Sequence, residues 1–324
     1  MYDVVIVGGG VAGLSAALTL GRGRRRVLVI DGGAPRNAPS SHAHGFLSRD
    51  GISPLELLRT ARDDLREYPN VEFRRGDAQT ASRTDGGFIL ALADGDVIET
   101  RKLLLATGVI DVLPDIEGMA ELWGRGVNHC PYCHGWEIRD RTWAMLDETT
   151  ATFDRVALYR NWAADLVILS NGVSQLDSAE RDRLAKLGVS IDERRVARVG
   201  HAEGDDVLVS FENGESLVAG GIFAAPPQVQ RSSIPEVLGC ELDELGPTGS
   251  RYVRVDATTG ESTVSGVYAA GDMVGPMQFL SFAAASGVRA AAALNRAFVI
   301  EEAEAVLAGP VASQDAVTRA SATG

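Results

Sequence analysis

The chain has 324 residues, and at about 150 residues per domain this length predicts two domains. Its hydrophobic fraction of 45% and its charged fraction of 23% are typical of a globular protein and exclude a disordered or collagen-like chain. Because 31 Lys and Arg stand against 44 Asp and Glu, the formal net charge is -13, and such a surface disfavours nucleic acid and anionic lipid as partners.

Neither an export signal nor a membrane span is expected. The first strand begins at Tyr2, which leaves no room for a signal peptide before it. The longest apolar stretch, residues 279–300, contains Arg289 and Arg296 and indicates an Ala-rich core helix. Three cysteines are too few for a disulfide framework, so we expect a cytoplasmic protein.

The first 31 residues predict a βαβ unit. An apolar run rich in Val and Ile at residues 2–7, bounded by glycine, is typical of a buried parallel strand. A helical stretch at residues 14–20 and a second strand at residues 27–30 follow. This order is the one in which a glycine-rich turn binds a dinucleotide.

The turn between this strand and helix carries the spacing GxGxxG. Gly8 permits the tight turn, Gly10 allows the backbone to approach a pyrophosphate, and Gly13 allows the helix to pack closely on the strand. The N-terminus of the helix offers free N–H groups and a partial positive charge to the phosphates. Asp31, at the end of the second strand, is the expected acceptor for the hydroxyls of an adenosine ribose.

Two later strands end in residues that would flank the same ligand. The strand expected at residues 102–106 closes on Thr107-Gly108, and the strand expected at residues 266–270 runs into Gly271-Asp272. About 160 residues separate these ends, which predicts an inserted domain. Other expected elements are a helix at 53–67 and strands at 71–75 and 88–93.

We therefore predict an α/β fold with two Rossmann-like nucleotide-binding domains, the second inserted into the first. Residues 1–115 and 245–324 form the first domain, and residues 116–244 form the insert. Within the insert the pattern predicts strands and helices in βαβ order, at 143–146, 152–162, 166–169, 179–187 and 190–192.

The insert contains the sequence Cys130-Pro-Tyr-Cys133-His134. This spacing lets two thiols close a small ring, and a cysteine in such a motif has its pKa lowered from about 8.5 toward 7 or below, which supplies a thiolate. Half of a zinc site and a pair of inert cysteines are the alternatives, and a zinc site lacks its second pair of ligands at a plausible spacing. We expect no metal, and we interpret Cys240 as a small core residue.

Four motifs follow one another in the chain: GxGxxG at 8–13, ATG at 106–108, CxxC at 130–133 and GD at 271–272. A chain with these motifs in this order resembles the low-molecular-weight thioredoxin reductases. It also resembles the related dithiol oxidases that close disulfides in natural products such as gliotoxin and holomycin. The resemblance runs from Tyr2 to about Ala297. It implies FAD on the first domain, a redox-active cysteine pair in the insert, and a homodimer. It assigns to the cofactor Gly8, Gly10, Gly13, Asp31, Arg36, Asn37, Thr107, Gly108, Gly271, Asp272 and Gln278.

The resemblance also implies roles for the residues of the CxxC segment. Cys133 faces the flavin, and Cys130 is the outer thiol that forms a mixed disulfide with the substrate. Thioredoxin reductases carry Asp where this chain has His134, and a histidine there can move a proton between thiol and flavin. His129 is a second candidate base. His42 and His44 line the substrate side of the flavin or lie in a surface loop.

The insert lacks the motif that an NADPH site needs. After the strand at 143–146 the chain reads Asp147-Glu148-Thr-Thr-Ala-Thr152, without glycine. A charge contact at about 4 Å is worth roughly 1 to 4 kcal/mol, here repulsive toward phosphate. The next strand leads into residues 170–175, which include no cation for a 2′-phosphate. We predict that the protein does not use NADPH efficiently.

These observations predict an FAD-dependent dithiol oxidase that forms a disulfide in a small molecule or peptide and passes the electrons to molecular oxygen. A thioredoxin-type disulfide reductase fed by NADPH or ferredoxin is the second hypothesis, although an acidic surface disfavours an acidic ferredoxin. A flavin-binding redox sensor without turnover is the third. Because a dithiol oxidase needs access for only one ligand, we expect the two domains to keep one orientation, with the disulfide stacked on the flavin.

Overall fold

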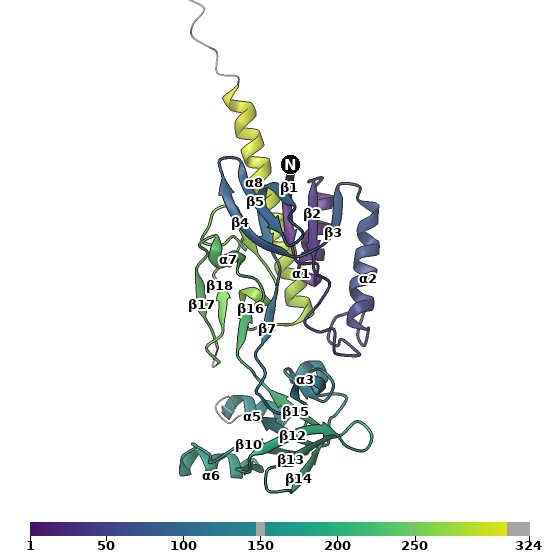
Figure 1. The fold of residues 1–324 in the computed structure, drawn as a ribbon, viewed down its shortest axis with the longest axis vertical. Helices are drawn as coiled ribbons and strands as arrows, with labels where there is room; N and C mark the ends of the chain where they lie inside the picture. The colour runs from purple at the N-terminus through teal and green to yellow at the C-terminus, as the bar shows by residue number, and fades with distance from the viewer. Residues whose placement is uncertain (147–152, 247, 310–324) are drawn as a thin grey trace, which may run out of the picture.

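The computed structural model of the protein describes residues 1–146, 153–246 and 248–309. Figure 1 shows two lobes, with β7 (Val109–Asp111) and β16 (Gln228–Gln230) between them. These two strands pair antiparallel, so the chain leaves the first lobe and returns to it side by side. None of the helices in these ranges combines the length and the apolar character needed to cross a membrane.

The first lobe is built on a seven-stranded sheet, in which β6 (Val97–Leu105) is central. One edge of β6 pairs with β1, and its other edge pairs first with β5 and then with β19. The remaining neighbours follow in the order β3-β2-β1 on one side and β5-β4 on the other. The bounds are β1 (Tyr2–Val7), β2 (Val27–Asp31), β3 (Val71–Arg75), β4 (Ala78–Thr84), β5 (Gly87–Leu92) and β19 (Val267–Ala269).

Helices and a small hairpin cover the two faces of this sheet. Alternate residues of β1 point to opposite faces, so Val4 and Ile6 pack under α1 (Val11–Arg22) and α8 (Leu280–Ala308), while Val5 and Val7 face the other layer. The other elements of this lobe are α2 (Pro54–Asp64), a 3₁₀ turn (Leu65–Glu67), α7 (Ile234–Val237), β17 (Leu242–Glu244), β18 (Arg251–Val253) and a 3₁₀ turn (Asp272–Val274). α7 and β17 lie within the range 116–244 expected for the insert, and their side chains Ile234 and Leu242 pack against the first sheet.

The second lobe holds a parallel sheet in the order β11-β10-β9-β15-β8. The expected βαβ order is confirmed, because β9, β10 and β11 pair parallel with α5 and α6 between them in sequence. An antiparallel sheet β12-β13-β14 packs beside it. The bounds are α3 (Met119–Leu122), β8 (Val127–Asn128), α4 (Pro131–His134), β9 (Thr142–Leu146), α5 (Phe153–Tyr159), β10 (Asp165–Leu169), α6 (Ser178–Lys186), β11 (Val189–Asp192), β12 (Val196–His201), β13 (Val207–Phe211), β14 (Ser216–Ala219) and β15 (Gly221–Ala224).

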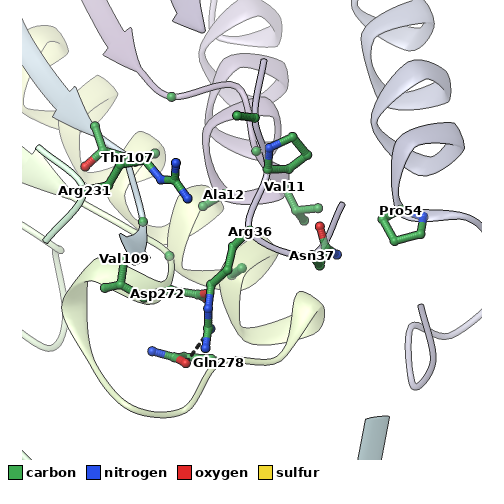
Figure 2. Close-up of a pocket in the computed structure, with 18 of the residues that line it drawn as sticks. Val11, Ala12, Arg36, Asn37, Pro54, Thr107, Val109, Arg231, Asp272 and Gln278 are labelled. Carbon is green, nitrogen blue, oxygen red and sulfur yellow. Dashed lines mark hydrogen bonds and ion pairs between the residues drawn. The ribbon is translucent and has the colours of Figure 1, made fainter. Parts of the chain in front are cut away.

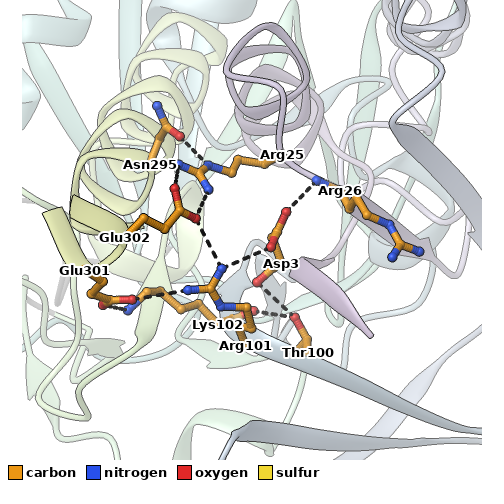
Figure 3. A network of polar contacts seen from close by, with 9 residues as sticks. All are labelled: Asp3, Arg25, Arg26, Thr100, Arg101, Lys102, Asn295, Glu301 and Glu302. Atoms are coloured by element: carbon orange, nitrogen blue, oxygen red, sulfur yellow. Dashed lines mark hydrogen bonds and ion pairs between the residues drawn. The ribbon is translucent and has the colours of Figure 1, made fainter. Parts of the chain in front are cut away.

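Charged side chains tie the far half of α8 to the first sheet (Figure 3). Arg25 pairs with Glu302 at 2.5 Å, and Lys102 pairs with Glu301 at 2.5 Å. The guanidinium of Arg25 also lies 4.9 Å from the ring centroid of the buried Phe298. This anchoring holds α8 against the sheet, and the N-terminal end of α8 thereby has a fixed position beside the site described next.

Candidate functional site

A cavity of about 720 Å³ is lined by residues of both lobes. It brings together the glycine-rich turn after β1, the ends of β2, β6 and β19, and the CxxC segment. Of the predicted site residues, these line it: Gly8, Gly10, Asp31, Arg36, Asn37, Thr107, Gly108, His129, Cys130, Cys133, His134, Gly271, Asp272 and Gln278. His42 and His44 also line it, which favours the first of the two interpretations offered for them.

Gly13 is the exception, because it lies inside α1 and packs against the turn. The helix begins at Val11, with Gly10 as its N-cap, three residues before the expected start. A Cβ at position 13 would lie 1.9 Å from the carbonyl oxygen of Gly8, so only glycine fits. A Cβ at position 10 would meet nothing within 4 Å, since it would project into open space. The free N–H groups of the helix therefore face a region that a phosphate can reach.

Asp31 ends β2 at the edge of the cavity. One carboxylate oxygen accepts a hydrogen bond from the backbone N–H of Gly9 at 3.1 Å, and the other accepts from Arg62 of α2 at 2.5 Å. The sequence gives no local sign of this partner, since Arg62 lies 31 residues away in an amphipathic helix. These two contacts fix the orientation of the Asp31 carboxylate between the glycine-rich turn and α2.

Arg36 is the centre of a polar network at the opposite end of the cavity (Figure 2). Its guanidinium pairs with Asp111 of β7 at 2.6 Å and with Asp272 at 3.2 Å, and it donates to the side-chain oxygen of Gln278 at 2.6 Å. Gln228 of β16 donates to Asp111 at 2.9 Å and exchanges hydrogen bonds with Gln278. The network thus joins predicted cofactor residues to the two strands between the lobes.

The pKa values of the two carboxylates in this network are shifted in opposite directions. Burial acts to raise the pKa of Asp111, but the hydrogen bonds and the charge of Arg36, with the hydrogen bond from Gln228, hold that pKa below its usual value. Burial raises the pKa of Asp272, and Arg36 offsets only part of that effect. Burial therefore makes the ionised form of Asp272 costly, which is typical of a functional residue.

Cys130 and Cys133 form a disulfide, with their Cα atoms 5.3 Å apart. Cys130 is the N-cap of the short helix α4, and Pro131 begins the helix, where a missing N–H is tolerated. The backbone N–H of Cys133 donates to the carbonyl of Cys130 at 3.2 Å, which closes the turn around the disulfide. Cys240 is buried in the first lobe, and burial raises the pKa of its thiol, which fits the inert core role expected for it.

Two imidazoles flank the disulfide in sequence and line the same cavity. The Nε2 of His134 lies 3.3 Å from the hydroxyl of Ser40, and its Nδ1 is buried and has no hydrogen-bond partner among the described residues. Burial lowers the pKa of His134. Burial, with the nearby charge of Arg36, lowers the pKa of His129 to about 4. Both rings are therefore neutral near pH 7, and the low pKa of His129 makes it a weak base.

A loop of the first lobe contacts the CxxC segment at several points. Besides the contact between Ser40 and His134, the ring of His44 lies 3.5 Å from Glu137 on one side and 3.5 Å from Asp50 on the other. Arg125, which precedes β8, donates to the carbonyl of Pro39 at 2.7 Å. These contacts hold the disulfide segment against the first lobe.

The chain is similar over most of its length to several known oxidoreductases. Residues 2–157 match the model of the pyridine nucleotide-disulphide oxidoreductase family. Thioredoxin reductase tcpT of Claviceps purpurea is 35% identical over 84% of this chain and 86% of its own. Thioredoxin reductase sirT of Leptosphaeria maculans is 31% identical over 91% of this chain and 94% of its own.

Solved structures agree with this relationship. The crystal structure of HlmI superposes with a TM-score of 0.86 at 37% identity, over 95% of each chain. An oxidoreductase from Agrobacterium tumefaciens gives a TM-score of 0.85 at 33% identity, over 92% of this chain and 99% of the other. The chain belongs to the pyridine nucleotide-disulphide oxidoreductase family, in its thioredoxin reductase-like branch. It is an oxidoreductase, and the predicted fold class and resemblance are confirmed.

Proposed function

We propose that this protein is an FAD-dependent dithiol oxidase that needs no NADPH. A dithiol of a small molecule or peptide gives up two electrons and two protons, becomes a disulfide, and molecular oxygen becomes hydrogen peroxide. The observation that carries the proposal is that the disulfide Cys130–Cys133 lines the same cavity as the glycine-rich turn and Asp272. The disulfide and the residues that we propose bind the dinucleotide therefore line one cavity.

The residues of the cavity fit FAD. The open space beside Gly10 and the free N–H groups of α1 suit a pyrophosphate, and Asp31 suits the ribose of adenosine. Asp272 and Arg36 offer an acceptor and a donor farther along the cavity, where a ribityl chain and a flavin ring would follow. FAD bound here would accept an electron pair from the cysteines and pass it to oxygen.

The chain's own groups supply the thiol chemistry. Cys130 receives the attack of a substrate thiolate, and a mixed disulfide forms as the Cys130–Cys133 bond breaks. Attack by the second substrate thiol on the mixed disulfide releases the product disulfide and leaves the two cysteines reduced. His134, which burial keeps neutral, takes up a thiol proton beside them, and His129, with its pKa of about 4, is a weak second acceptor.

A weak NADPH site is part of the proposal. Residues 147–152, whose sequence replaces the expected glycines, lie outside the described residues. Among the described residues, two cations near the ends of β10 and β11 are already paired: Arg181 lies 2.6 Å from Glu193, and Arg194 lies 2.5 Å from Asp192. A 2′-phosphate bound by either of these two arginines would have to displace its carboxylate, which supports a weak NADPH site.

The names of the relatives favour a second candidate, a disulfide reductase of the thioredoxin reductase type. The two functions separate in one anaerobic experiment on the yellow holoprotein. Dithiothreitol bleaches the flavin of an oxidase, and air restores the colour with formation of hydrogen peroxide. If NADPH bleaches the flavin and dithiothreitol does not, the protein is a reductase. If neither reagent bleaches the flavin, the protein is a redox sensor. Cys133→Ser should remain yellow with the dithiol.

The remaining parts of the proposal concern organisation. We infer that the insert is a degenerate nucleotide-binding domain within residues 116–244, and that the protein is a cytoplasmic homodimer. The family resemblance supports the dimer, and sedimentation of the holoprotein at micromolar concentration tests it. A monomer would contradict this part and leave the proposed reaction untouched.

A further inference from the structure

Three aromatic side chains form a continuous strip that starts between the two cysteines. Tyr132 lies in the CxxC segment, and its ring centroid is 5.9 Å from that of Phe279. Phe279 lines the cavity beside Cys130 and Cys133, and its centroid is 5.8 Å from that of Phe282. Tyr132 is 55% exposed and Phe282 is 52% exposed, so both ends of the strip reach the surface, and Phe279 connects the strip to the cavity.

The inner end of the strip is held rigid by the core of the second lobe. The ring of Tyr132 meets Trp162 edge-on at 5.2 Å, and Trp162 stacks at 6.3 Å on Trp143, which is fully buried. Tyr132 is thus fixed between Trp162 and Phe279, and little side-chain entropy remains to be lost when a ligand covers it.

We propose that this aromatic strip, Tyr132, Phe279 and Phe282, binds an uncharged, planar apolar body carried by a small dithiol substrate. The inference rests on the proposed function and names the class of its substrate. Half-exposed aromatic rings beside a reactive disulfide leave apolar surface in contact with water, which costs free energy. A planar apolar group that covers the rings removes this surface from water and gains hydrophobic free energy of binding.

The area of the strip favours a small apolar ligand over a protein. Aromatic side chains bury about 150 to 250 Å² when fully covered, so two half-exposed rings offer roughly 150 to 250 Å² in total, far below the about 800 Å² per partner of a stable protein interface.

The test compares two dithiols in Phe282→Ala. Dithiothreitol has no apolar body, whereas 1,2-benzenedimethanethiol presents the same pair of alkyl thiols on a planar ring. In the holoprotein we measure the second-order rate constant of anaerobic flavin bleaching by each. The variant should lose about three- to tenfold with the aromatic dithiol and keep its rate with dithiothreitol, which corresponds to the loss of one aromatic contact. Val299→Ala, an exposed change near the other end of α8, should alter neither rate.

The outcomes separate this inference from the proposed function. If neither dithiol bleaches the wild-type flavin, the proposed function fails and the inference fails with it. If both dithiols bleach it but Phe282→Ala leaves their ratio unchanged, or slows both equally, only the inference is overturned. A greater loss with reduced thioredoxin than with the aromatic dithiol would also overturn it, because the strip would then be a protein-docking surface.

Discussion

His129 provides the sharpest quantitative test of the site, because its imidazole is buried next to a cation. The pKa of this group falls from 6.5 to about 4, through burial and the charge of Arg36. The folded protein therefore resists protonation of a ring that the unfolded chain protonates below pH 6.5. By linkage, the stability that this neutral ring allows is fully present above pH 6.5 and is lost as the pH falls toward 4.

The size of the effect follows from these two values. With about 1.4 kcal/mol per pH unit, the loss between pH 7.5 and pH 4.5 is about 2.5 kcal/mol. His129→Gln removes the titrating ring. Between pH 7.5 and pH 4.5, the free energy of unfolding of this variant should therefore fall by about 2 to 3 kcal/mol less than that of wild type. Asp272 titrates in both proteins, whereas the charge of His129 acts on Asp111, so the measured difference includes the change that the substitution causes in the titration of Asp111.

Urea denaturation of wild type and variant at the two pH values, with matched flavin content, measures the difference. His201→Gln, at an exposed position at the end of β12, controls for the loss of an imidazole as such. If the pH dependence of His129→Gln lies within about 1 kcal/mol of that of wild type, the ring is not held neutral by its surroundings, and the reasoning is wrong.

Three further changes probe the cavity. Asp111→Asn leaves the Arg36 cation with fewer partners and should lower the free energy of unfolding in urea by about 2 to 3 kcal/mol, whereas Glu56→Gln in an exposed ion pair should change it little. Gly10→Ala should keep the melting temperature of the wild-type apoprotein but lose flavin absorbance, since its Cβ would occupy only ligand space. Gly13→Ala should instead lower the melting temperature, because its Cβ would clash with a backbone oxygen.

The first βαβ unit could be predicted closely because its signals are local. The apolar run of β1, the glycine turn and Asp31 all act within one stretch of chain, and β1 has the expected bounds. The start of α1 was the exception: Gly13 looks like a helix breaker in sequence, but it is helical, since the carbonyl of Gly8 occupies the space of its missing side chain.

The Arg36 network could not be predicted, because its contacts join distant parts of the chain. Arg36 is separated from Asp111 by 75 residues and from Gln278 by 242. The strands β7 and β16 that carry Asp111 and Gln228 are three residues long, too short for a periodic pattern. β4 was missed for a related reason, since only Ala81 of its seven residues is buried.

The contacts between the lobes bear on how the enzyme works. A reductase that exchanges NADPH and a protein substrate over one flavin must reorient its lobes in each cycle, whereas an oxidase with one substrate need not. Ser40 contacts His134 and Arg125 donates to Pro39, so reorientation would break polar contacts at two places. A single working orientation is therefore the expectation for this protein.

A covalent link across this boundary tests that expectation. In Ser41→Cys/Arg125→Cys, both positions are exposed and lie beside the contact between Arg125 and Pro39, so a short bis-maleimide can bridge them. The oxidised Cys130–Cys133 pair does not react with maleimide, and the resulting thioethers survive the dithiol substrate. The bridged protein should keep the turnover of the same variant treated with a monofunctional maleimide. If bridging abolishes flavin bleaching by dithiothreitol while the monofunctional control retains it, the lobes must move during the reaction, and the single-orientation account is wrong.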